Sequence, residues 1–121
     1  MPPYLPGRRE ALEHRFGWAR ALGPHVYLAL ELHHGPYDTK QRRWLIDASL
    51  RHALPLVAAG DVHQHARHRR ALQDVLTCIR HGCTLDEAGR RLLPNGERHL
   101  RSAKTLHALY PVDALATAAR I

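Results

Sequence analysis

A chain of 121 residues is long enough for one domain with a modest hydrophobic core and too short for two. Hydrophobic residues make up 45% and charged residues 24%, and no apolar run approaches the roughly 18 residues that a membrane-spanning helix needs, which excludes a membrane protein. The net charge of +7 is compatible with contacts to nucleic-acid phosphates, although an arginine- and alanine-rich composition is equally typical of a GC-rich genome.

The N-terminus and the cysteines predict a cytoplasmic protein. Residues 1–8 are rich in proline and lack the charged stretch and apolar core of a signal peptide, so we expect a loose arm here. Cys78 and Cys83 are the only cysteines, and without a secretory signal they are expected to remain free thiols in a reducing compartment.

The first half of the chain alternates helical and strand patterns. Short apolar runs rich in β-forming residues predict buried strands, and apolar residues at helical spacing predict the helices between them. Gly23-Pro24 ends the first helix, and Asp38 or Thr39 is expected to cap the second. The predicted elements are a helix over residues 8–22, a strand over 25–32, a helix over 38–53 and a strand over 55–60.

Acidic and imidazole side chains follow both predicted strands. A strand–helix–strand unit implies parallel strands whose carboxyl ends share one edge of the sheet. Glu31, with His33 or His34, is therefore expected to lie near Asp61 and His63. Carboxylate oxygens and imidazole nitrogens suit Zn, Mn or Fe, so the pattern indicates a metal site or an acid–base pair.

Simpler roles for these side chains stay open. Asp61 is placed to cap the helix that follows it, which is a common role for aspartate. The other polar groups would then cap turns or pair with arginines, and neither role needs a ligand.

The second half of the chain is predicted to be helical. A basic cluster at residues 65–70 precedes a helix over 71–80, and Gly82 ends that helix. Thr84 and Glu87 form the pattern of a capping box, and residues 94–96 predict a turn. Two further helices are expected over residues 102–110 and 112–121. The predicted buried stripe of the helix over 71–80 comprises Leu72, Val75, Leu76 and Ile79.

Three separated stretches carry a resemblance to a known family. Residues 54–63 (Leu-Pro-Leu-Val-Ala-Ala-Gly-Asp-Val-His), 70–80 and 94–102 resemble the later part of the PHP (polymerase and histidinol phosphatase) domain of bacterial C-family DNA polymerases. These are the polymerase III alpha subunits, and the likeness is greatest to their error-prone branch. It runs in order from about Phe16 to the C-terminus.

The resemblance implies the fold. The family's PHP domain is a distorted seven-stranded β/α barrel, so we expect an α/β fold: a partial (β/α) PHP-type barrel with parallel strands, followed by helices leading toward the polymerase body. The expected divisions are a loose arm at 1–8, the later part of the PHP domain at 9–93 and a linking helical segment at 94–121.

The resemblance also implies a metal site. Asp61 and His63 match the family's last Asp-x-His ligand pair, and His34 before Gly35 matches a His-Gly position. With Glu31 they are the expected ligands of Zn or Mn. The family's earlier His-x-His motif has no counterpart in this chain, and neither do the three palm carboxylates. We therefore predict an incomplete site and no catalytic residue, whereas the parent polymerase would use Mg.

These expectations combine into one favoured function and two alternatives. The favoured function is a fragment of an error-prone DNA-directed DNA polymerase, a nucleotidyltransferase of DNA replication, repair and translesion synthesis, in which the PHP portion acts as scaffold. The alternatives are a metal-dependent phosphoesterase or 3′–5′ exonuclease half-site, and a basic DNA-binding module. Unpaired sheet edges also predict self-association. The predicted nucleic-acid-binding residues are Arg67, Arg69, Arg70, Arg98 and Arg101.

Overall fold

The structure is a computed structural model that describes residues 8–121, so the predicted N-terminal arm lies outside the described residues except for Arg8, which begins the first helix. The chain divides into two compact units. We call residues 8–59 together with 103–121 unit 1, and residues 60–102 unit 2. No helix in the described part of the chain is long and apolar enough to cross a membrane.

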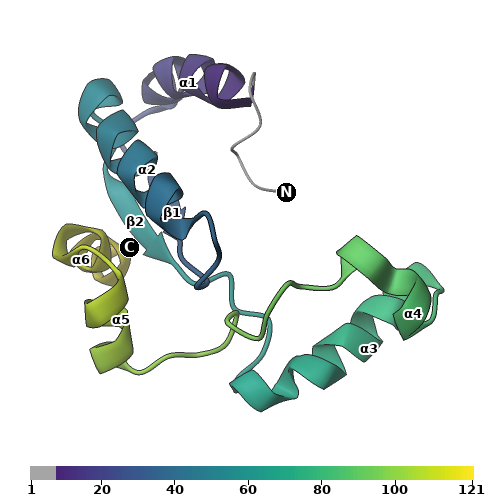
Figure 1. Cartoon of the computed structure of the whole chain (residues 1–121). Helices are drawn as coiled ribbons and strands as arrows, with labels where there is room; N and C mark the ends of the chain where they lie inside the picture. Colours follow the sequence, from purple (N-terminus) through teal and green to yellow (C-terminus); the bar gives the residue numbers. More distant parts are fainter. Residues whose placement is uncertain (1–7) are drawn as a thin grey trace. The chain divides into compact units, whose positions relative to one another are not determined.

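Unit 1 is a mixed α/β arrangement with the predicted order of elements (Figure 1). The predicted first helix ends in a 3-10 turn over Arg20–Leu22. The strands are shorter than their apolar runs because only four residues of each pair across the sheet. The elements are α1 (Arg8–Ala19), β1 (Leu28–Glu31), α2 (Asp38–His52), β2 (Leu56–Ala59), α5 (Ala103–Leu109) and α6 (Val112–Arg120).

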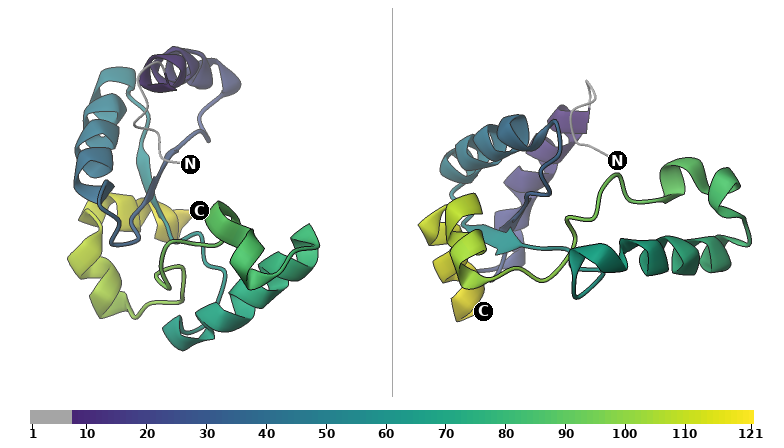
Figure 2. Two further views of the ribbon diagram at one scale, coloured as in Figure 1. Left: turned by 45° about the vertical axis from the view of Figure 1, so that its right-hand side comes forward. Right: turned by 60° about the horizontal axis from the view of Figure 1, so that its bottom comes forward.

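The strand–helix–strand prediction is confirmed. β1 and β2 pair in parallel from Leu28 opposite Leu56 to Glu31 opposite Ala59, and α2 forms the connection between them. Among the described residues the sheet has these two strands alone. α6 runs alongside β2, as Figure 2 shows.

The core of unit 1 forms between β1 and α2. Side chains alternate along a strand, so Leu28, Leu30 and Leu32 point to one face, and all three are buried. Trp44 and Leu45 of α2 belong to the same buried cluster. Leu30 is fully buried, at 0% exposure, and marks the centre of this core.

Tyr110, between α5 and α6, joins the ends of both strands. Its hydroxyl donates a hydrogen bond to the carbonyl of Ala59 (2.9 Å) and accepts one from the backbone N–H of Leu32 (3.2 Å). One buried side chain thus satisfies two backbone groups just where the parallel pairing stops.

Glu13 ties α1 to α2. Its carboxylate accepts hydrogen bonds from the indole of Trp44 (2.9 Å) and from the guanidinium of Arg51 (2.8 Å for each nitrogen), and it lies 2.7 Å from Nε2 of His52. The hydrogen bonds from Arg51 have the largest effect on the carboxyl group. With those of His52 and Trp44 they outweigh its partial burial and lower the pKa of Glu13 to about 2.

This pKa predicts a loss of stability in acid. The folded-state pKa lies below the ordinary value of 4.5, so the unfolded chain binds the proton more tightly. The stabilisation is complete above about pH 4.5 and disappears as the pH falls toward 2. We expect the melting temperature, followed by circular dichroism, to fall across this window. The Glu13→Gln variant should melt lower than wild type at pH 6 and lose less stability on acidification. Equal pH dependence of the two proteins would contradict this role.

Unit 2 is helical. A 3-10 turn (Arg67–Arg69) leads into α3 (Arg70–His81), and α4 (Leu85–Ala88) follows and lies beside α3 (Figure 2). Gly82 ends α3 with a φ of 59°, a left-handed conformation that glycine adopts without strain. The capping box of Thr84 and Glu87 is confirmed.

The two cysteines lie in unit 2 and are free thiols, as predicted. Burial raises the pKa of the Cys78 thiol, and the neighbouring Cys83 raises it further. Cys78 therefore behaves as a small apolar residue at the end of α3.

The prediction that the apolar stripe of α3 is buried is wrong. Leu72 and Leu76 are each 52% exposed, and Ile79 is 71% exposed. The buried residue of α3 is Cys78, which is not one of the four residues predicted for the stripe. Periodicity correctly identifies an apolar face, but within the described residues that face has little covering it.

Candidate functional site

The carboxyl end of β1 places an acid beside an imidazole. Nε2 of His33 lies 3.8 Å from Oε2 of Glu31, and the His33 side chain is 14% exposed against 39% for Glu31. The imidazole next to Glu31 is therefore that of His33. His34, the residue expected from the His-Gly pattern, is exposed and has a left-handed backbone with a φ of 53°.

Asp38 fixes the loop that carries these histidines. Its Oδ2 accepts a hydrogen bond from the backbone N–H of His33 at 2.8 Å. The N-cap of α2 is Tyr37, with no side-chain capping bond, so the prediction that Asp38 or Thr39 caps this helix is wrong. The Asp38 side chain instead accepts a hydrogen bond from the backbone of the preceding turn. Aspartate commonly stabilises turns in this way as an alternative to capping a helix.

The segment after β2 brings the predicted Asp-x-His pair into contact. Nε2 of His63 lies 3.2 Å from Oδ1 of Asp61, and Oδ2 of Asp61 is ion-paired with Arg98. Asp61 does not cap the following helical turn, whose N-cap is Ala66. The simpler alternative, in which the acidic groups pair with arginines, is thus present at Asp61. A carboxylate has about four acceptor sites, so this pair leaves room for a further ligand.

A short backbone ladder positions this pair. The N–H groups of His63 and Gln64 both donate to the carbonyl of Arg98, at 2.9 and 3.2 Å, and Leu100 donates to the carbonyl of Gln64. Gln64 also forms a parallel bridge with His99. The ladder brings Arg98 next to Asp61, although the two residues are 37 positions apart in the sequence. No local sequence pattern predicts this ion pair.

Three residues other than glycine have a left-handed backbone, in the part of the chain that the structure describes: His34, Ala53 and Asp61. Ala53 ends α2 and is a helix terminus of common type. His34 and Asp61 follow the two strands and are both predicted ligands. Conformations of this kind cost free energy and cluster at functional sites.

Glu97 is a buried acid that the sequence pattern did not single out. It is 8% exposed and forms ion pairs with two of the five arginines predicted to bind DNA. Arg67 lies 3.1 Å from its Oε1, and Arg101, whose side chain is only 4% exposed, lies 3.3 Å from its Oε2. Arg101 therefore serves to hold this turn together.

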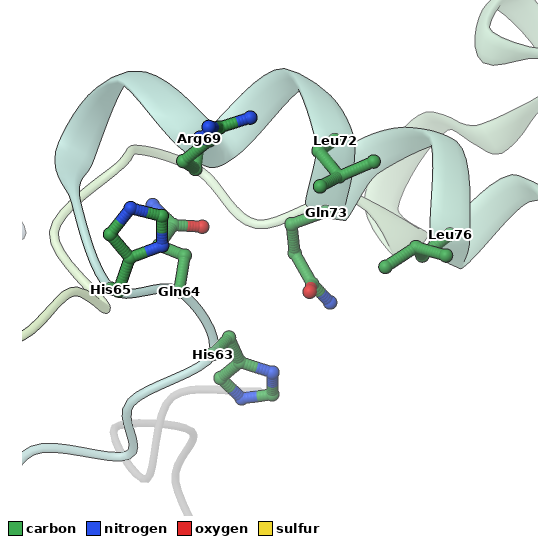
Figure 3. A pocket seen from close by; sticks show the side chains of 7 residues that line it. All are labelled: His63, Gln64, His65, Arg69, Leu72, Gln73 and Leu76. Atoms are coloured by element: carbon green, nitrogen blue, oxygen red, sulfur yellow. The ribbon is translucent and has the colours of Figure 1, made fainter.

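The remaining arginines differ in their partners. Arg70 lies 3.4 Å from Asp74 and donates to the carbonyl of Leu93 at 2.8 Å, and Arg98 is paired with Asp61. Arg69 forms no ion pair with any described residue. It lines a pocket of about 220 Å³ whose other walls include His63, His65, Gln73 and Leu76 (Figure 3).

The chain is similar to one segment of much longer DNA polymerases. It is 46% identical over 118 residues, 98% of this chain, to the error-prone DNA polymerase of Azoarcus sp. strain BH72. It is 49% identical over 79% of its length to that of Pseudomonas fluorescens strain Pf0-1, and 51% identical over 74% to that of Dechloromonas aromatica. No protein-family profile matches the chain.

These similarities identify the chain as similar to one segment of DNA polymerases. More narrowly, it corresponds to a fragment of the proteins named error-prone DNA polymerase. It spans about a tenth of the length of these relatives, with 11% of the Azoarcus protein and 9% of the other two covered. The resemblance to the error-prone branch that the sequence patterns carried is thereby confirmed.

Proposed function

We propose that this chain is the later part of the PHP portion of an error-prone DNA polymerase, where it acts as a scaffold and holds an incomplete metal site. The observation that carries the proposal is the parallel β1–β2 pair with acid and imidazole residues at the end of each strand, in a chain similar to these polymerases. In the parent, β1 and β2 would be two strands of a partial (β/α) barrel. Residues 9–93 would belong to the barrel and 94–121 to the link toward the polymerase body.

Chain connectivity supports a shared metal site. Ala59 lies opposite Glu31 in the sheet, and Asp61 is two residues beyond Ala59. Two trans peptide steps keep the Cα atom of Asp61 within about 7.6 Å of that of Ala59. The donors proposed for the site are the carboxylates of Glu31 and Asp61 and the imidazoles of His63 and His34, with His33 as a further candidate.

The chemistry of these donors fits Zn or Mn. Both metals accept imidazole nitrogen together with carboxylate oxygen, and such a site has no need of thiolates. A bound metal would supply Lewis-acid chemistry. This chain's own residues would hold it and orient one another, as Asp61 does for His63 at 3.2 Å.

The first test is metal content. We expect the purified chain, loaded with Zn or Mn and then dialysed, to retain close to one equivalent by elemental analysis. The Asp61→Ala, His63→Ala double variant should lose it because two donors are removed.

A matched control is available on the same unit. The His81→Ala, Asp86→Ala variant removes the same two residue types from exposed positions and should keep the metal. Retention of metal by the Asp61, His63 variant, or no metal in the wild type, would reject the site and leave the scaffold role alone.

The activity proposed for the whole protein is DNA-directed DNA synthesis in replication, repair and translesion synthesis. It would act in the cytoplasm, with Mg at catalytic carboxylates elsewhere in the parent. The proposed role of this segment is structural, and self-association through the unpaired edges of β1 and β2 stays a prediction. A 3′–5′ exonuclease half-site is the second candidate, favoured by the contact of Asp61 with His63.

A further inference from the structure

The pocket beside α3 combines cationic, amide and apolar groups. His65 and Arg69 precede or begin the helical segment, and Leu72, Gln73 and Leu76 come from α3 itself (Figure 3). No carboxylate is among the residues that line it. The lining therefore offers hydrogen-bond donors and an apolar wall. Asp61, which contacts the lining residue His63, is itself ion-paired with Arg98.

Arg69 differs from the other four arginines predicted to bind DNA. Arg67, Arg70, Arg98 and Arg101 are each paired with a carboxylate of unit 2, whereas Arg69 has no such pair among the described residues. A guanidinium has five N–H donors in a planar fork that matches a phosphate. Arg69 can therefore bind a phosphate without breaking an existing ion pair.

The apolar wall narrows the class of ligand. Leu72 and Leu76 are each half-exposed and stand one helical turn apart beside the polar groups. A bare inorganic anion leaves such a wall exposed to water, whereas a nucleotide covers it with its sugar or base. Bases are accessible in this way only where the strand is unpaired, because duplex DNA stacks them inside.

We propose that this pocket binds a phosphodiester of single-stranded DNA, with the phosphate on Arg69 and the adjoining base on Leu72 and Leu76. His65 and Gln73 also line the pocket and are further donors available to the bound nucleotide. The proposal rests on the proposed function, since it assumes that the parent acts on DNA. At about 220 Å³ the pocket is small for a ligand site, so it takes one phosphate and part of the adjoining nucleotide.

The test measures binding of a short fluorescein-labelled oligothymidylate by fluorescence anisotropy at low salt. The Arg69→Ala variant is expected to bind roughly tenfold more weakly than wild type, as for loss of one charge-assisted contact. A plot of log affinity against log salt concentration has a negative slope. In Arg69→Ala this slope should be less steep than in wild type by about 0.7. The Leu72→Ser, Leu76→Ser variant should weaken binding and leave that slope unchanged.

Arg90→Ala is the matched control, because it removes one positive charge from an exposed position elsewhere on unit 2. It should change affinity less than twofold, and circular dichroism should show all variants folded. Equal losses for Arg69→Ala and Arg90→Ala would overturn the proposal in favour of general charge attraction. Equal affinity for duplex, or stronger competition by an acidic peptide than by unlabelled oligonucleotide, would overturn it too.

Failure here is distinguishable from failure of the proposed function. A chain that holds metal through Asp61 and His63 but ignores single-stranded DNA would refute the pocket alone. A chain that binds the oligonucleotide through Arg69 but holds no metal would refute the metal site alone.

Discussion

Replacing Leu30 by alanine is expected to lower the free energy of unfolding by about 2–5 kcal/mol, because it leaves a cavity in the centre of the core. Leu30 is fully buried in β1, between Leu28 and Leu32 along the strand and against Trp44 and Leu45 of α2. The loss combines the transfer free energy of the missing carbons with the cavity that they leave. Urea denaturation followed by tryptophan fluorescence measures it.

Leu50→Ala is the matched control for this substitution. Leu50 is on α2 and is 78% exposed, so the same chemical change should alter stability by less than about 0.5 kcal/mol. If Leu30→Ala cost no more than Leu50→Ala, the β1–α2 core would not be assembled in the isolated chain.

Removing the hydroxyl oxygen of Tyr110 is expected to lower the free energy of unfolding by about 1–3 kcal/mol. Tyr110→Phe keeps the buried ring but removes both the bond to the Ala59 carbonyl and the bond from the Leu32 N–H. Each of these backbone groups then lacks this partner at the end of the parallel pair. Denaturation measures the stability loss, and hydrogen exchange should show faster exchange of the Leu32 amide.

Tyr27→Phe controls for loss of a hydroxyl as such. Tyr27 lies just before β1 and forms no hydrogen bond through its hydroxyl with any described residue, so its removal should be close to neutral. Unchanged exchange at Leu32 in Tyr110→Phe would show that the hydroxyl does not hold the strand ends together.

Much of unit 1 is predictable from local sequence because its signals are local. Two short apolar runs, separated by a helical pattern and bounded by glycine and proline, determine the parallel β1–α2–β2 unit. The same holds for the end of α3 at Gly82 and for the capping box at Thr84. In each case the residues that decide the structure lie within a few positions of one another.

The exposure of the α3 stripe was not predictable in this way. A spacing of three and four residues shows that Leu72, Leu76 and Ile79 share a face, but not what covers that face. The same limit applies to the candidate site. The order of the strands predicts that Glu31 and Asp61 follow neighbouring strands, whereas the pairing of Asp61 with Arg98 depends on a backbone ladder between distant segments.

Unit 1 is discontinuous along the chain, and this has a consequence for its synthesis. A ribosome produces β1 and β2 before residues 60–102, and only afterwards Tyr110 and α6, which complete the packing around β2. Unit 2 is continuous and can form its contacts as soon as it emerges. Unit 2 is therefore free to fold before unit 1, which the ribosome begins earlier, is finished; this is the reverse of the usual vectorial order.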